Sequence, residues 1–208
     1  IMDNHILQIS KSRKNILDIL ETSLNYNVED YKNFNINEID AMYSNEQLDM
    51  LIEHNENKKK VYIKYFVGGK KMISKIVDKY IEDLYELETI LTPKDTLIII
   101  SQDEPNDTII NHIKHIYMSK DIFIVINTLK RLQFNVTGIN LVPKMTILEE
   151  TEESDLIKTY NLKSKKQLPE ISRFDPQAIA MLMRPGNIGK IERNSVTSLT
   201  YDYYRICV

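Results

Sequence analysis

The sequence predicts an α/β domain with a largely parallel sheet over residues 1–138, followed by an α+β domain with a terminal β-hairpin over residues 139–208. Three observations support this fold class. Short apolar runs alternate with helical periodicity up to residue 126, this alternation ends after Gly138, and two strand-like segments lie at residues 188–193 and 201–208. With 208 residues and 42% apolar content, the chain is long enough to bury the cores of two domains.

The first domain begins with an amphipathic helix and then becomes polar. Apolar side chains recur at spacings of three and four over residues 6–24, which favours a helix with one buried stripe. The Asn-rich segment 26–57 carries only short apolar fragments. We expect loops around one or two short helices there.

Three strands and two helices are expected to alternate in the rest of this domain. Residues 61–67 have the β-branched and aromatic content of a strand, and residues 96–101 and 122–126 are continuous apolar runs typical of strands buried on both faces. Helical periodicity covers residues 72–87 and 107–119. Strands separated by helices in this order imply parallel pairing with crossover helices.

The second domain carries clear helix and turn signals. Acidic residues crowd the start of a short helix near residues 149–160, and Asp175-Pro176 combines a capping side chain with a proline suited to the first helical position. Arg184-Pro185-Gly186-Asn187 suits a β-turn. Two strands are expected over residues 188–193 and 201–208.

Charge and composition exclude several classes of protein. The chain has 27 Lys and Arg against 30 Asp and Glu, and neither predicted domain is strongly basic, so no global attraction to nucleic acid or membrane is expected. The single cysteine, Cys207, argues against a disulfide-framed secreted protein. We find no apolar run of about 20 residues and no signal-peptide layout, and we expect a soluble intracellular protein.

Motifs for cofactor or metal chemistry are weak. His112 and His115 are three residues apart on a predicted helix, but no third ligand lies near them, and surface histidines are the simpler interpretation. The sequence has no phosphate-binding loop, dinucleotide fingerprint, nucleophile elbow or paired cysteines. We therefore predict no cofactor, no metal and no catalytic residue.

Seven short segments of the C-terminal part carry a recognisable pattern. They are residues 141–144, 160–163, 167–171, 175–176, 184–186, 190–197 and 204–207. Taken together, these segments resemble the assembly domain of the RNA polymerase subunit 5 family, which has eukaryotic and archaeal members. Their order and spacing agree with that family without gaps over roughly the last 70 residues.

Four positions depart from the family pattern. Met145, Leu182, Val196 and Leu199 stand where the family usually has His, Gly, Glu and Gly. These departures indicate a distant branch. The long N-terminal domain, absent from the archaeal form, and the richness in Lys, Asn and Ile favour a polymerase of a large DNA virus, in the virion and host cytoplasm. A nuclear subunit of a cellular polymerase remains the alternative.

The resemblance implies a non-catalytic subunit that acts in transcription. It implies an N-terminal jaw domain near downstream DNA and a C-terminal domain docked on the largest subunit, close to subunit 6, with the catalytic aspartates on the largest subunit. The jaw domain of this family resembles restriction-endonuclease folds, which need an acid-x-Lys element to hold a metal. Here Tyr62 takes the place of the acid before Lys64, so cleavage chemistry is expected to be absent.

The candidate binding residues follow from the same resemblance. The partner-binding candidates are Pro143, Lys144, Leu168, Pro169, Asp175, Pro176, Arg184, Gly186, Lys190, Arg193, Ser195, Thr197, Tyr204 and Arg205. The DNA-proximal candidates are Lys58, Lys59, Lys60, Lys70 and Lys71. Each group also has a simpler interpretation. The prolines can shape turns, the strand charges and lysine loops can be solvent-exposed, and the tyrosines can pack inside the domain. The competing function is a free DNA-binding or nuclease-like regulator.

Overall fold

The computed structural model describes residues 4–69, 71–195, 197 and 199–208, and it divides the chain into two units. The N-terminal unit runs to Asn135 and the C-terminal unit starts at Val136, whereas the sequence analysis placed its boundary after Gly138. Each unit contains helices and its own β-sheet. The mixed α/β class predicted from the sequence is confirmed at this level, and the likeness to restriction-endonuclease folds stays a prediction.

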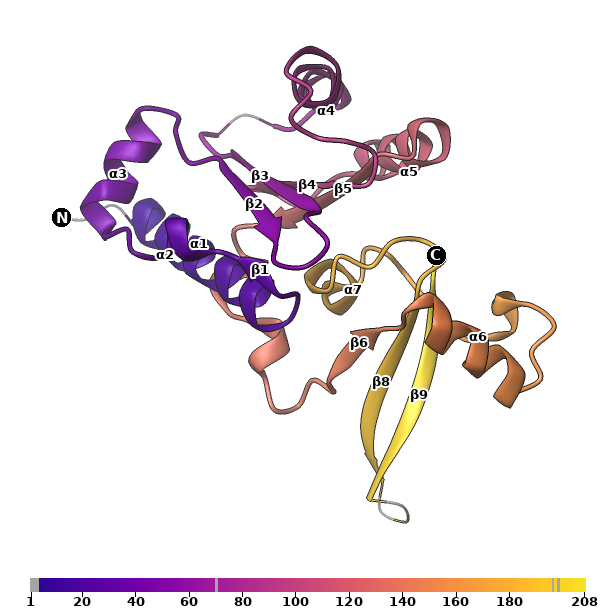
Figure 1. Ribbon diagram of the computed structural model, residues 1–208. Coiled ribbons are helices and arrows are strands. Elements are labelled where there is room, and N and C mark those ends of the chain that lie inside the picture. Colours follow the sequence, from indigo (N-terminus) through magenta and orange to yellow (C-terminus); the bar gives the residue numbers. More distant parts are fainter. Residues whose placement is uncertain (1–3, 70, 196, 198) are drawn as a thin grey trace. The chain divides into compact units, whose positions relative to one another are not determined.

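The N-terminal unit is built on a five-stranded sheet flanked by helices (Figure 1). Its elements are α1 (Asn4–Thr22), β1 (Tyr26–Asn27), α2 (Glu29–Lys32), α3 (Ile36–Ser44), β2 (Met50–His54), β3 (Lys60–Phe66), α4 (Ser74–Ile81), the π-helical η1 (Glu82–Leu87), β4 (Thr96–Ser101), α5 (Asp107–Lys120), β5 (Phe123–Thr128) and the 3₁₀ turn η2 (Arg131–Gln133).

The sheet of this unit is mixed. Its strand order is β1-β2-β3-β4-β5, with β3, β4 and β5 parallel, as the strand–helix alternation predicted. The prediction of a largely parallel sheet was incomplete, because β1 and β2 add two antiparallel pairings. Both strands lie in the segment expected to hold only loops and short helices. Met50 and Ile52 are the buried residues of β2, too few to give a recognisable strand pattern alone.

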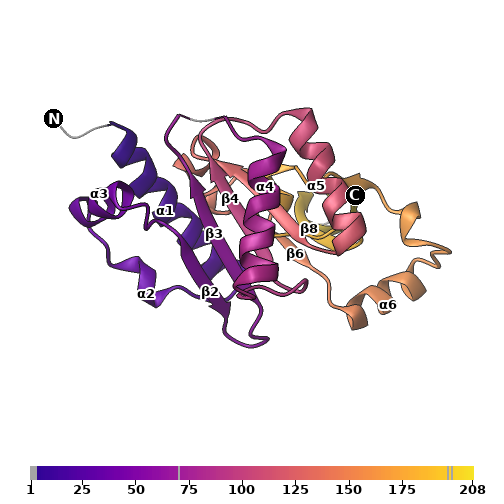
Figure 2. The same cartoon turned by 90° about the horizontal axis from the view of Figure 1, so that it is seen from above.

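Helices cover both faces of this sheet. α4 and α5 lie on one face and α1 on the other (Figures 1 and 2). Leu97, Ile99 and Ile124 belong to the apolar core under α4 and α5. On the opposite side, the Ser12 hydroxyl of α1 lies 3.4 Å from the Tyr65 hydroxyl of β3. The continuous apolar runs are thus explained by burial on both faces.

The helix expected over residues 72–87 is irregular. It begins at Ser74 and changes to a π-helical segment at Glu82. The Leu84 carbonyl accepts the amides of Ile90 and Leu91 just beyond it. Periodicity alone does not record such an irregularity. Among the described residues, no helix has the length and apolar character needed to cross a membrane.

The C-terminal unit has a four-stranded sheet in the order β6-β8-β9-β7. Its elements are η3 (Val136–Gly138), β6 (Met145–Ile147), α6 (Glu150–Thr159), η4 (Lys165–Gln167), β7 (Glu170–Ile171), α7 (Pro176–Ala180), β8 (Ile188–Ser195) and β9 (Leu199–Cys207). The expected terminal hairpin, β8 with β9, is confirmed and extends to the pair Ser195–Leu199. The short flanking strands β6 and β7 were not predicted.

Candidate partner-binding surface of the C-terminal unit

The terminal hairpin separates its side chains onto two faces. Opposite residues of an antiparallel pair share a face, and successive residues of a strand alternate between faces. The register pairs Lys190 with Tyr204 and Glu192 with Asp202, and we call this set the lysine face. The other set, Arg193, Tyr201, Tyr203 and Arg205, is the arginine face. The hairpin therefore presents two chemically different surfaces.

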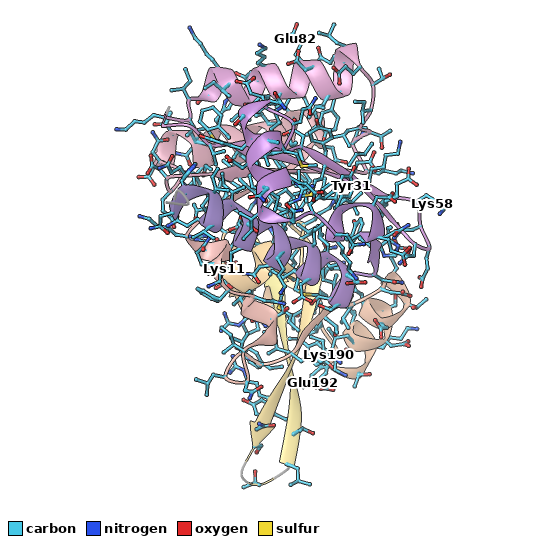
Figure 3. The ribbon with its side chains drawn as sticks, turned by 90° about the vertical axis from the view of Figure 1, so that its left-hand side faces the viewer. Lys11, Tyr31, Lys58, Glu82, Lys190 and Glu192 are labelled. Carbon is cyan, nitrogen blue, oxygen red and sulfur yellow. The ribbon has the colours of Figure 1, made fainter. Side chains whose placement is uncertain are left out.

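Lys190 of the lysine face forms an ion pair within the unit. The Lys190 ammonium lies 2.9 Å from an Asp202 carboxylate oxygen, and this hydrogen bond raises the pKa of Lys190. Figure 3 marks Lys190 and Glu192 on the hairpin. Asp202 was not among the predicted residues, because only the strand register places it beside Lys190. The predicted partner-binding Lys190 thus has a partner inside the unit.

Tyr204, another predicted contact, packs inside the unit. It borders the apolar cluster of Leu148, Leu156 and Ile188, and burial raises the pKa of its phenol. Its ring meets the ring of Tyr160 edge-on, with centroids 5.9 Å apart. Tyr160 itself is 57% exposed. For Tyr204, internal packing is therefore a role that the structure accounts for.

The turn over residues 184–187 has the geometry that its sequence favours. Gly186 has φ 93°, a left-handed value that glycine adopts without strain, and the Asn187 amide donates to the Arg184 carbonyl at 3.0 Å. The Gly186 amide donates to the Cys207 carbonyl at 2.9 Å. This turn is consequently fixed against the end of β9.

The predicted residues before and within α7 also have structural roles. Asp175 accepts the Gln177 amide at 2.9 Å and caps α7, with Pro176 at its first position, as expected. The Gln177 side-chain amide donates to the Pro143 carbonyl at 2.6 Å. The next carbonyl, of Lys144, accepts the Glu192 amide at 2.9 Å. These bonds tie the loop before β6 to α7 and β8.

Four other candidates lie just before β7 and at the end of the hairpin. Leu168 packs on the apolar cluster beneath α6, and the Pro169 carbonyl accepts the Ile206 amide at 2.9 Å. Ser195 and Thr197 lie at the hairpin end, with hydroxyls 3.2 Å apart. Thr197 is exposed and Ser195 half-buried.

The backbone explains why the family usually has glycine at two of the four departing positions. Leu182 and Leu199 have φ values of 50° and 59°, in the left-handed region where the family's glycine is unstrained. Met145 is buried in β6, so it is a packing residue here. Val196 lies outside the described residues.

The predicted DNA-proximal lysines are not gathered into one patch. Lys58 and Lys59 are exposed in the loop between β2 and β3, and Figure 3 marks Lys58 at the periphery of the unit. Lys60 begins β3, whereas the exposed Lys71 follows that strand's other end. A strand of this length separates the two groups by about 20 Å. Lys70 lies outside the described residues.

A cleft of about 670 Å³ in the N-terminal unit contains the residues expected to decide nuclease chemistry. Asp49, just before β2, forms an ion pair with Lys64 of the neighbouring strand. The same carboxylate accepts the Tyr62 hydroxyl at 3.1 Å and the Tyr65 amide at 3.3 Å. Burial and the nearby Asp49 charge raise the pKa of Tyr62 well above its ordinary value. Asp49 was not among the predicted residues, because only the register of β2 with β3 brings it to Lys64.

The two histidines of α5 have different surroundings. Nε2 of His112 lies 2.7 Å from an Asp78 carboxylate oxygen of α4, and His115 is exposed. Within the described ranges, no group of three or more His, Cys, Asp or Glu side chains is placed to hold a metal ion.

Comparison with known proteins defines the class to which this unit belongs. The family model described as "RNA polymerase Rpb5, C-terminal domain" matches residues 134–207, the segment that forms the C-terminal unit. The Rpo5 subunit of the DNA-directed RNA polymerase of Thermococcus kodakarensis is 40% identical over 76 residues, which are 36% of this chain and 92% of that protein.

Two further relatives agree. The Rpo5 subunit of Pyrococcus abyssi is 40% identical over 76 residues, again 36% of this chain and 92% of that protein. In Dictyostelium discoideum, the subunit rpabc1 of DNA-directed RNA polymerases I, II and III is 39% identical over 77 residues, 37% of this chain and 39% of that protein. The chain belongs to the RNA polymerase subunit 5 family.

Proposed function

We propose that this DNA-directed RNA polymerase subunit is non-catalytic and acts by docking its C-terminal unit on the largest subunit, close to subunit 6. The observation that carries the proposal is the uncovered length of the terminal hairpin. β6 pairs only with Gly189, Lys190 and Ile191 of β8, and β7 pairs only with Ile206 and Cys207 of β9. Residues 193–195 and 199–205 of the hairpin thus have no flanking strand and are available to a partner, in the segment that matches the family model.

The exposure of the hairpin agrees with a docking role. Leu199 is 85% exposed and Tyr201 is 42% exposed near its end. Tyrosine and arginine are enriched where protein surfaces meet, because they combine a large contact area with hydrogen bonding. Burial of these side chains against a larger subunit would remove apolar surface from water.

The N-terminal unit is proposed to form part of the lower jaw of the enzyme near downstream DNA. Lys58, Lys59 and Lys71 supply exposed positive charge, but they lie at two ends of β3. They would add a modest, salt-sensitive attraction to phosphates within the complex. Location follows the polymerase: the virion and host cytoplasm for a viral enzyme, the nucleus for a cellular one.

The arrangement around Asp49 supports a non-catalytic role. A nuclease metal needs free carboxylate oxygens. Both oxygens of Asp49 accept hydrogen bonds, from Lys64 and Tyr62 on one oxygen and from the Tyr65 amide on the other. The Asp49 carboxylate is therefore engaged by hydrogen-bond donors of the same unit.

The experiment is affinity purification of the chain from cells that contain its polymerase, with a tag at residue 1. The largest subunit and subunit 6 should be recovered with it. As a matched control, a chain shortened to residues 1–135 keeps the N-terminal unit and should lose both partners. Recovery of the chain without any polymerase subunit would contradict the proposal.

A second assay separates this function from a free regulator. At about 150 mM salt, the purified chain should bind duplex DNA weakly, because its net charge of −3 offers little attraction. It should also leave DNA uncut in the presence of Mg²⁺. Tight binding or cleavage that is lost in Lys64→Ala would favour the nuclease-like regulator.

A further inference from the structure

The arginine face of the hairpin holds two cations on one aromatic ring. The guanidinium carbon of Arg193 lies 4.4 Å from the centroid of the Tyr203 ring, and that of Arg205 lies 5.4 Å from the same centroid. Cation–π contact fixes each guanidinium without using its N–H donors. The two arginines are thus held in place with their hydrogen-bonding capacity largely unused.

Neither guanidinium has a carboxylate partner in the part of the chain that the structure describes. Arg205 makes one long hydrogen bond, 3.4 Å, to the Glu170 carbonyl, and its buried Nε finds no acceptor among the described residues. Leaving a buried donor without an acceptor costs free energy. Nη2 of Arg205 also makes no hydrogen bond in the described part of the chain, and it remains for an acceptor on a partner.

The acidic residues of the sheet lie on the opposite face. Glu192 and Asp202 share the lysine face, and Glu170 of β7 pairs with Ile206, which places it on that side too. In β6, the residues that share the arginine face are Met145 and Ile147. Cations and carboxylates on the hairpin are therefore segregated.

The base of the arginine face is closed and its outer part is open. Next to Gly189, Met183 and Met145 approach so closely that an added Cβ would lie 3.2 Å and 3.3 Å from their side-chain atoms. Toward the hairpin end, Arg193 and Tyr203 are half-buried and Tyr201 is exposed. Solvent therefore reaches the outer part of the arginine face, where Arg193 lies.

We infer that the arginine face binds a carboxylate-bearing, acidic segment of the partner protein, with Arg193 and Arg205 as its forks and Tyr203 as their common support. The inference rests on the proposed function and names the chemistry of that partner. The planar guanidinium fork matches a carboxylate with two parallel hydrogen bonds. A nucleic-acid backbone is the less suitable ligand, because proteins bind it with many cations. The arginine face offers only Arg193 and Arg205, and the carboxylates of Glu192 and Asp202 lie on the opposite face of the same hairpin.

The test uses the full chain and fluorescent short peptides that together cover the largest polymerase subunit of the same genome. The wild-type chain should bind peptides rich in Asp and Glu, and R193Q/R205Q should weaken their binding about tenfold or more. K163Q/K166Q removes the same charge from exposed lysines of the same unit and should leave binding unchanged. Binding should also weaken as salt is raised.

A single variant guards against a folding artefact. The Arg193 side chain makes no hydrogen bond or ion pair within the described ranges, so R193K should fold normally. R193K keeps the charge and loses the fork, and its affinity should fall between those of the wild type and R193Q. Thermal unfolding of each variant provides the check on folding.

Several results would overturn the inference. These are equal binding of the acidic peptides by R193Q/R205Q, binding only of peptides without carboxylates, no peptide binding at all, and tighter binding of a single-stranded oligothymidylate that R193Q/R205Q abolishes. If wild type and R193Q/R205Q co-purify equally with the polymerase, the inference fails and the docking function stands. If the wild type does not co-purify, the docking function itself fails.

Discussion

Asp49 and Lys64 form an ion pair between the residue that precedes β2 and the middle of β3, inside the cleft of the N-terminal unit. Both side chains are partly buried, and the carboxylate also receives the Tyr62 hydroxyl and the Tyr65 amide. This single acid thus connects the antiparallel strand β2 to the first parallel strand of the sheet.

Asp49→Ala should lower the free energy of unfolding of the N-terminal unit by about 2 kcal/mol, because it leaves one cation and two donors without their acceptor. Urea unfolding followed by circular dichroism measures the change. Glu88→Ala is the matched control, since Glu88 lines the same cleft but is exposed. Equal midpoints for the two variants would show that Asp49 has no structural role.

Asp175→Ala should destabilise the C-terminal unit by about 1 kcal/mol, because the Gln177 amide loses its cap and the short helix α7 frays. Hydrogen exchange of the amides of residues 177–183 reports the fraying directly. Asp155→Ala removes the same charge from the exposed surface of α6 and should change little. Unaltered exchange in Asp175→Ala would contradict a capping role.

Leu199→Gly should stabilise the C-terminal unit by about 1 kcal/mol, since a left-handed backbone strains leucine and not glycine. Little packing is lost, because Leu199 is 85% exposed. The neighbouring Thr200→Gly, in extended strand backbone paired with Asn194, should destabilise instead. Thermal unfolding compares the two variants, and a lower midpoint for Leu199→Gly would refute the explanation from backbone strain.

Cys207 should react slowly with thiol reagents in the native chain. Burial raises the pKa of its thiol from 9.0 to about 11, and Sγ lies 3.5 Å from the Met183 carbonyl oxygen. At pH 8 the native thiolate fraction should be about a hundredfold smaller than in denatured chain. An aromatic disulfide reagent releases a coloured thiol when it reacts with Cys207, and the absorbance of that thiol gives the labelling rates of the native and the denatured chain. Comparable rates would mean that the thiol is accessible.

The same pKa shift predicts a loss of stability in alkali. Below pH 9 the thiol is protonated in native and unfolded chains, so its contribution to the free energy of unfolding is fully present. Between pH 9 and about pH 11 the unfolded chain loses the proton first, and the free energy of unfolding falls. C207S lacks this titration, so its stability should fall less across that window.

Local sequence signals predicted the elements that depend on local chemistry. The apolar runs of β4 and β5 and the Asp175-Pro176 start of α7 are such elements, and the structure contains them at the expected places. The strands β1, β6 and β7 have only two or three residues, and they exist because a neighbouring strand pairs with them. No local pattern records that pairing.

The candidate surface was predictable only in part. Alternation along the hairpin indicated exposed charges, but the register decides that Lys190 meets Asp202 while Arg193 meets Tyr203. Contacts between distant segments, such as Asp49 with Lys64, likewise appear only after the sheet is assembled. Such contacts depend on tertiary structure, and no local pattern in a single sequence indicates which distant residues will meet.

The order of strands in the C-terminal sheet has a consequence for biosynthesis. The two central strands, β8 and β9, are translated after β6 and β7, and β6 and β7 have no partner in the sheet until β8 and β9 emerge. The ribosome must therefore deliver the chain through β9 before the sheet of this unit can form. Until then, β6 and β7 would be unpaired and accessible to chaperones. A stop codon introduced before residue 199 would remove β9, and the truncated product should be degraded by proteases.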